Sequence, residues 1–194
     1  MMKIDVRIPF EPGGRLGEDY NRVMEETKHD WVLFLDHDVF LCNPHWYHLC
    51  QFSIQSQPKA GMFSCWTNNL GDTPQRHPDA PVTHCLIEHK KFARVIWDQY
   101  QYSLTGIGKC SGMLMLISKK AWGAVGCFPA QGLFKEDWTF TKRLVKGGFQ
   151  VFRIDGLYVY HMRDRDDGSW IDGHKTSKEL RDERMGDKLA KKKK

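Results

Sequence analysis

The sequence contains no hydrophobic run that approaches the roughly 20 apolar residues needed to cross a bilayer. Its N-terminus, MMKIDVRIPF, lacks the apolar core and the cleavage pattern of a signal peptide. Internal repeats and low-complexity tracts are also absent. We therefore expect a soluble, cytoplasmic protein with no transmembrane segment.

Cysteine pairing motifs are missing as well. The six cysteines are scattered, form no CxxC, and mostly lie in apolar surroundings, which is typical of reduced packing residues. We expect no disulfides. A zinc site is a weaker hypothesis, because its four candidate ligands match no common zinc module in their spacing: Cys42, His45, His48 and Cys50.

Most of the chain lacks an excess of either charge. The segment 175–194 contains nine Lys or Arg and four Asp or Glu, which accounts for the whole formal net charge of +5. We expect one domain over residues 1–174, large enough to bury a core, followed by a basic tail over 175–194. Such a tail is either a solvated end or a segment that attracts nucleic acid, such as DNA, or an acidic membrane.

The hydrophobic pattern predicts an α/β domain with a mostly parallel central sheet. Residues 3–9 alternate as a strand, residues 17–30 have helical spacing, and Trp31–Leu35 is a continuous apolar run typical of a strand buried on both faces. This order makes a βαβ unit. Further strands are expected at 60–66 and 112–117, and further helices at 86–102, 119–125 and 138–146. Strands 149–154 and 157–161 should form a hairpin around Asp155-Gly156.

Two carboxylates end the buried strand in WVLFLDHDVFLCNP. In an extended chain residues i and i+2 point the same way, so Asp36 and Asp38 can reach one centre while His37 turns aside. Ligands of open α/β sheets bind at the carboxyl ends of strands, and carboxylate oxygens suit Mg²⁺ or Mn²⁺. The alternative is a pair of solvated loop carboxylates.

The segment FLDHDVFLCNP resembles the DxD segment of family 2 glycosyltransferases with the GT-A fold. LGEDYNRVMEET resembles the helix before it, and SGMLMLISKKAW followed by FKEDWTFTKRLVKGGFQVFRI resembles the acceptor-side strand and the "ED" helix. The similarity runs in order over roughly residues 8–163. It implies a Rossmann-like GT-A domain that transfers a sugar from a nucleotide-sugar, with a UDP-sugar as the expected donor, to a glycan or another hydroxyl acceptor.

The resemblance also implies roles for individual residues. Asp38 would bind Mn²⁺ or Mg²⁺ directly, Asp36 would contact it through water or hold the ribose, and His161 would supply a further ligand. Asp137 matches the catalytic base and Glu136 the group that binds acceptor hydroxyls. Acidic residues at a helix start can instead simply stabilise the helix.

The nucleotide is expected against the first strand and its loop. Candidates for binding it are Pro9, Phe10, Glu11 and Arg15, with Arg163 as a further ligand for phosphate. The chain departs from the family here, because only about 26 residues separate Pro9 from Asp36, where the family usually has two more strands. The nucleotide-binding half is therefore abbreviated.

Three other functions fit the same features. The basic tail and small size suit an enzyme that glycosylates a modified base in DNA. The short nucleotide-binding half suits a GT-A domain that binds a nucleotide or a glycan without turnover. A nucleotidyltransferase fits the "ED" helix less well.

Overall fold

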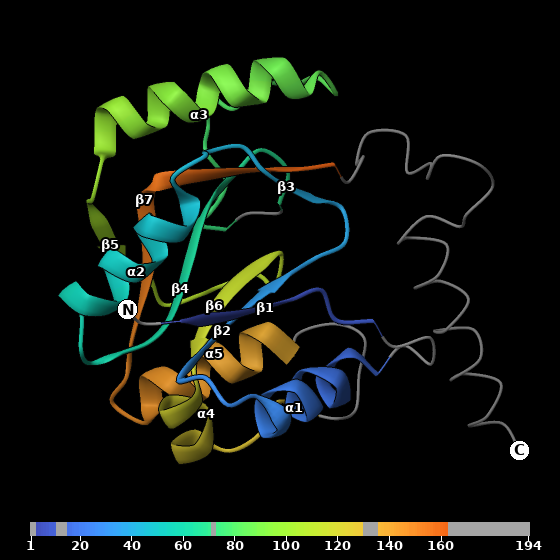
Figure 1. Ribbon diagram of the computed structural model, residues 1–194, viewed down its shortest axis with the longest axis vertical. Helices are drawn as coiled ribbons and strands as arrows, with labels where there is room; N and C mark the ends of the chain where they lie inside the picture. Colours follow the sequence, from blue (N-terminus) through green and yellow to red (C-terminus); the bar gives the residue numbers. More distant parts are fainter. Residues whose placement is uncertain (1–2, 11–14, 71–72, 130–135, 163–194) are drawn as a thin grey trace, which may run out of the picture. The chain divides into compact units, whose positions relative to one another are not determined.

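Seven strands form one sheet that carries helices on both faces (Figure 1). The computed structural model describes residues 3–10, 15–70, 73–129 and 136–162. The strands are β1 (Ile4–Arg7), β2 (Trp31–Leu35), β3 (Val39–Leu41), β4 (Ala60–Thr67), β5 (Leu104–Gly106), β6 (Leu114–Ser118) and β7 (Gln150–His161). The helices are α1 (Leu16–Glu26), α2 (Trp46–Ser56), α3 (Leu86–Tyr100), α4 (Lys119–Val125) and α5 (Glu136–Lys146). None of these helices is long and apolar enough to span a bilayer.

Strand β2 lies inside the sheet and is buried along its whole length, as its apolar run predicts. Its side chains alternate between two cores, because successive residues of a strand point to opposite faces. Leu33 and Leu35 pack in one core with Leu49 of α2. Val32 and Phe34 pack in the other core with residues of α1, α4 and α5. The helices therefore cover opposite faces, with α2 on one and α1, α4 and α5 on the other (Figure 1).

The prediction of a mostly parallel sheet is wrong. The strand order is β1-β2-β6-β4-β7-β3, with β5 paired to β7. Only β1 with β2 and β4 with β7 are parallel, and the other four pairs are antiparallel. The error has a physical cause: a strand buried on both faces shows the same apolar run whichever way it runs. The mixed α/β class and the parallel β1-α1-β2 unit are confirmed.

The predicted hairpin around Asp155-Gly156 is also wrong, because β7 continues as one strand through this dipeptide. Asp155 is buried and accepts hydrogen bonds from Arg153 Nε and Thr105 Oγ1, both at 2.6 Å. A Cβ on Gly156 would lie 1.8 Å from the backbone oxygen of Gln101. The Asp-Gly pair therefore permits a close approach of two backbone segments and forms no turn.

Replacing Gly156 by alanine should destabilise the protein by about 3 kcal/mol or more, because backbone atoms cannot yield the space that a methyl group needs. Gly106→Ala is the matched control, since a Cβ there meets no atom within 4 Å. Its free energy of unfolding should stay within about 0.5 kcal/mol of wild type. Urea denaturation of both variants measures this, and equal stabilities would contradict the close approach.

Candidate functional site

The candidate site begins in a tight turn at the carboxyl end of β2. The Asp36 N–H donates to the Met113 carbonyl at 3.0 Å, and the Val39 N–H donates to the Asp36 carbonyl at 3.2 Å. Residues 37 and 38 thus lie in a turn, and the predicted extended geometry is wrong. The turn leads the chain directly from β2 into β3.

Pairing between β3 and β7 brings Asp38 to His161. Val39 lies opposite His161 in the antiparallel register, so the residue before Val39 meets the imidazole. Asp38 Oδ1 lies 3.3 Å from His161 Nε2, and both side chains are about 95% buried (4% and 5% exposed). Two groups that are far apart in the sequence therefore meet at one end of the sheet.

Hydrogen bonds to a nearby loop fix the orientation of the His161 ring. Its backbone N–H donates to Asn68 Oδ1 at 2.8 Å, and its Nδ1 lies 3.0 Å from the Asn69 carbonyl. A carbonyl only accepts, so Nδ1 must carry a hydrogen. In the neutral ring Nε2 then presents a lone pair to the Asp38 carboxylate, and the contact is favourable only when a proton or a cation lies between them.

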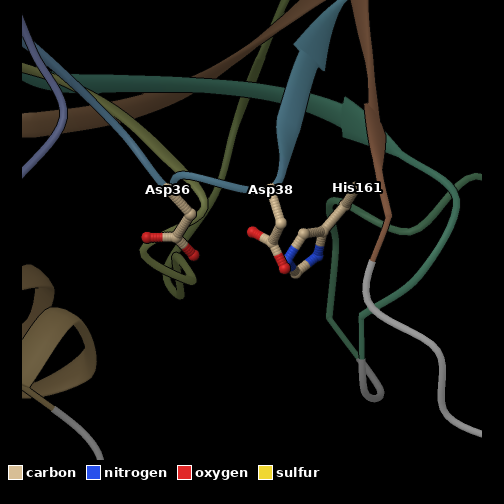
Figure 2. Close-up of side chains that lie close together, drawn as sticks. All are labelled: Asp36, Asp38 and His161. Carbon is tan, nitrogen blue, oxygen red and sulfur yellow. The ribbon is translucent and has the colours of Figure 1, made fainter. Parts of the chain in front are cut away.

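Asp36 completes a cluster in which one potential ligand atom from each of three residues lies within 4.8 Å of the others. Asp36, Asp38 and His161 project to the same side of the turn (Figure 2). Among the residues that the structure describes, no other group of three or more His, Cys, Asp or Glu fits a metal ion in this way. Two carboxylates with one imidazole suit Mn²⁺, and cis ligands about 2.1 Å from an ion are roughly 3 Å apart, close to the Asp38–His161 distance.

The two aspartates differ in their electrostatics. Burial raises the pKa of Asp36; the charge of His161 opposes this shift, and the neighbouring Asp38 charge adds to it. Burial alone would also raise the pKa of Asp38, but the hydrogen bond and charge of His161 hold that pKa below its usual value. Charged Asp36 is therefore disfavoured beside charged Asp38, and a bound cation would remove that penalty.

A second carboxylate site lies at the start of α5. Asp137 Oδ2 accepts from the Gly112 N–H, and Oδ1 accepts from the Trp138 N–H, each at 2.7 Å. Burial raises the pKa of Asp137 despite these hydrogen bonds. The charge of Asp137 in turn contributes to the raised pKa of Asp36. The two sites are therefore close enough to interact electrostatically.

Tyr20 of α1 adjoins both sites. Burial raises the pKa of its phenol well above the usual value, and the charges of Asp36 and Asp137 raise this pKa further. A Cβ on Gly112 would lie 3.6 Å from the Tyr20 hydroxyl and 3.6 Å from Asp137 Oδ2. The hydroxyl is thus a neutral polar group next to Asp137, in a region rich in carboxylates.

Glu136 is buried, and its Oε1 has no hydrogen-bond partner among the described residues. Burial raises the pKa of this carboxyl, and the charge of Asp137 adds to the shift.

Two residues of α1 contact the segments on either side of the gap at 130–135. A Cβ on Gly17 would lie 3.4 Å from Glu136 Cγ, and Asn21 exchanges hydrogen bonds with the backbone of Phe128. The Gly and Asn of LGEDYN therefore hold the segment around Phe128 against α1.

The predicted nucleotide-binding residues have simpler surroundings. Phe10 is 79% exposed, and its N–H donates to Asp19 Oδ2 at 2.8 Å. Pro9 lies beyond the end of β1, and exposed Arg15 pairs with Glu18 at 3.2 Å. Glu11, Arg163 and the basic tail lie outside the described residues.

Several residues that support the site were not identified from the sequence. Asn68 and Asn69 hold His161, and Gln75 is fully buried, where its Oε1 accepts from the Ser111 N–H at 2.6 Å next to Gly112. These three residues belong to the Asn-, Gly- and Pro-rich stretch after β4. Its composition indicates a loop, which is a frequent place for functional groups.

The zinc hypothesis receives no support. Among the described residues Cys42, His45, His48 and Cys50 do not form a group that could hold a metal ion, and His48 contacts the Tyr102 hydroxyl at 3.2 Å.

No family model matches the chain, and no curated protein is significantly similar to it.

Removing one side chain of the cluster should weaken cation binding. Asp38→Asn keeps the side-chain size but loses the charge, so Mn²⁺ affinity should fall by at least about tenfold. Asp98→Asn, which changes an exposed aspartate on α3, is the charge-matched control and should bind as wild type does. Isothermal titration calorimetry with MnCl₂ measures both, and equal affinities for Asp38→Asn and wild type would exclude a metal ligand at Asp38.

Proposed function

We propose that the protein is a metal-dependent inverting glycosyltransferase with a GT-A-like fold. It would move a sugar from a nucleotide-sugar to an acceptor hydroxyl. The observation that carries this proposal is that hydrogen bonds to two adjacent residues, Gly112 and Met113, hold two different sites side by side. One is the cluster of Asp36, Asp38 and His161, and the other is the carboxylate of Asp137. Sugar transfer needs one site to hold a diphosphate and another to remove a proton.

The cluster serves the leaving group. Breaking the bond between the sugar and the phosphate leaves a nucleoside diphosphate, and a bound Mn²⁺ or Mg²⁺ would neutralise its negative charge. Asp38 and His161 would hold the ion directly, while Asp36 would hold it through water or bind the ribose. Phe10, Pro9 and Arg15 are the described residues that we assign to the nucleotide, together with Glu11 and Arg163.

Asp137 serves the acceptor. As the acceptor oxygen bonds to the anomeric carbon, its proton passes to Asp137, and the bond from that carbon to the diphosphate breaks. The Gly112 and Trp138 amides fix the carboxylate, and each carboxylate oxygen keeps a lone pair for the incoming proton. Its raised pKa makes Asp137 a stronger base than an exposed aspartate.

Glu136 suits the binding of acceptor hydroxyls. Its buried Oε1 lacks a described partner, and a hydroxyl that donated to this oxygen would compensate for the lost solvation.

The direct test is a screen of nucleotide-sugars with Mn²⁺ that scores hydrolysis of the donor. Release of a nucleoside diphosphate from one donor by wild type, and its loss on chelation, would support transfer. Binding of nucleotides without release would instead favour a GT-A domain that binds without turnover.

Asp137→Asn should lower the transfer rate by about 10²–10⁴-fold, because an amide cannot take the acceptor proton at neutral pH. The substitution should also cost about 1–3 kcal/mol of stability, since one carboxylate oxygen becomes an NH₂ group and one of the two hydrogen bonds, from the Gly112 or the Trp138 N–H, is lost. Affinity for the donor nucleotide should stay close to wild type.

Phe140→Leu supplies the matched control for that loss of stability. Phe140 is fully buried on α5, so its truncation should destabilise the same helix while Asp137 keeps its carboxylate. Transfer rate, melting temperature and nucleotide affinity are measured on both variants. A similar rate in both variants would rule out a role for Asp137 as the base.

A further inference from the structure

Two lysine ammonium groups lie over the indole of Trp138. Lys109 Nζ is 4.1 Å from the ring centroid, and Lys142 Nζ is 5.3 Å from it. Lys109 comes from the loop before β6, whereas Lys142 lies one turn beyond Trp138 on α5. Attraction between a cation and an aromatic ring accounts for each position alone, but two like charges at one ring also repel each other.

This pair of charges borders the carboxylate that we assign as the base. Trp138 follows Asp137 directly and donates its N–H to Asp137 Oδ1. The charge of Lys109 is among the influences on the pKa of Asp137, so the ammonium group acts on that carboxylate. An acceptor whose hydroxyl lies at Asp137 would therefore have positive charge beside it.

The three groups differ in their exposure to solvent. Lys142 is exposed and forms no salt bridge with a described residue, while Trp138 and Lys109 are half-buried. An indole next to cations suits a sugar that carries a negative group, because the ring can contact the sugar while the ammonium groups bind the charge.

We propose that Lys109, Trp138 and Lys142 form a subsite for an acceptor sugar that carries a phosphate or a carboxylate. The subsite rests on the proposed function, because Asp137 defines which side of the site receives the acceptor. It differs from the site of the donor diphosphate, which we assign to the cluster of Asp36, Asp38 and His161. The enzyme would thus separate its two anionic ligands by using a metal ion for one and lysines for the other.

Binding of acceptor analogues tests the subsite without turnover. The probes are methyl glucoside, glucose 6-phosphate, glucuronic acid and inorganic phosphate, added to ¹⁵N-labelled protein. The indole N–H signal of Trp138, assigned by its loss in Trp138→Phe, reports binding. Glucose 6-phosphate or glucuronic acid should shift this signal with at least about tenfold higher affinity than methyl glucoside.

Substitutions then separate the subsite from general surface charge. Lys109→Gln combined with Lys142→Gln should abolish the preference for the charged sugar, whereas Lys120→Gln, an exposed lysine on α4, should keep it. Equal binding of charged and neutral sugars, no shift with any sugar, or a shift from inorganic phosphate as strong as that from the sugars would overturn the proposal.

Binding of Mn²⁺ with UDP to the same samples distinguishes this proposal from the proposed function. The double lysine variant should bind UDP as wild type does. If wild type binds Mn²⁺ and UDP but shows no preference for charged sugars, the acceptor subsite alone is wrong. If no nucleoside diphosphate binds with Mn²⁺ while the charged sugars still shift Trp138, the anion subsite stands and the proposed glycosyl transfer fails.

Discussion

The antiparallel pairing of β3 with β7 is the constraint on which the candidate site depends. It sets Val39 opposite His161 and so brings Asp38 to the imidazole. Strand β7 passes through Gly156 before it pairs with β3, and a side chain at Gly156 would collide with the Gln101 backbone. A glycine with no chemical role thus allows the strand that carries His161 to pack closely against its neighbour.

The site also concentrates negative charge in a way that stability alone does not favour. Burial raises the pKa values of Asp36, Asp137 and Glu136, and the charge of a neighbouring carboxylate raises those of Asp36 and Glu136 further. Their charged forms are therefore less stable in the folded protein than in water. Such arrangements are frequent at functional sites, where a ligand supplies the missing interaction. The proposed ligands, a cation at one site and a hydroxyl at the other, would each supply such an interaction to the charged carboxylates.

Part of this arrangement could be predicted from the sequence, because it depends on the order of residues along one segment. The apolar run before Asp36 predicts a buried strand, and the strand's end predicts where the carboxylates lie. Strand direction and the Asp155-Gly156 conformation could not be predicted in this way. A run buried on both faces carries no sign of direction, and an Asp-Gly pair is equally compatible with a turn and with a close approach of two backbones. Likewise, the hydrogen bond from the Gly112 amide to Asp137 could not be predicted from the residue type, because every residue except proline offers an N–H.

Different elements hold the two halves of the site, and this affects how it can work. The cluster of Asp36, Asp38 and His161 depends on the turn after β2, on β7 and on the Asn68-Asn69 loop. Asp137 instead depends on α5 and on Gly112 just before β6. The Asp36 N–H donates to the carbonyl of Met113, the residue after Gly112, so one short stretch of backbone holds both Asp36 and Asp137. Hydrogen bonds to adjacent residues therefore hold the backbone of Asp36 and the carboxylate of Asp137. The proposed sugar transfer needs the two sites to be fixed in this way, because its base and its leaving group would act on opposite sides of one carbon atom.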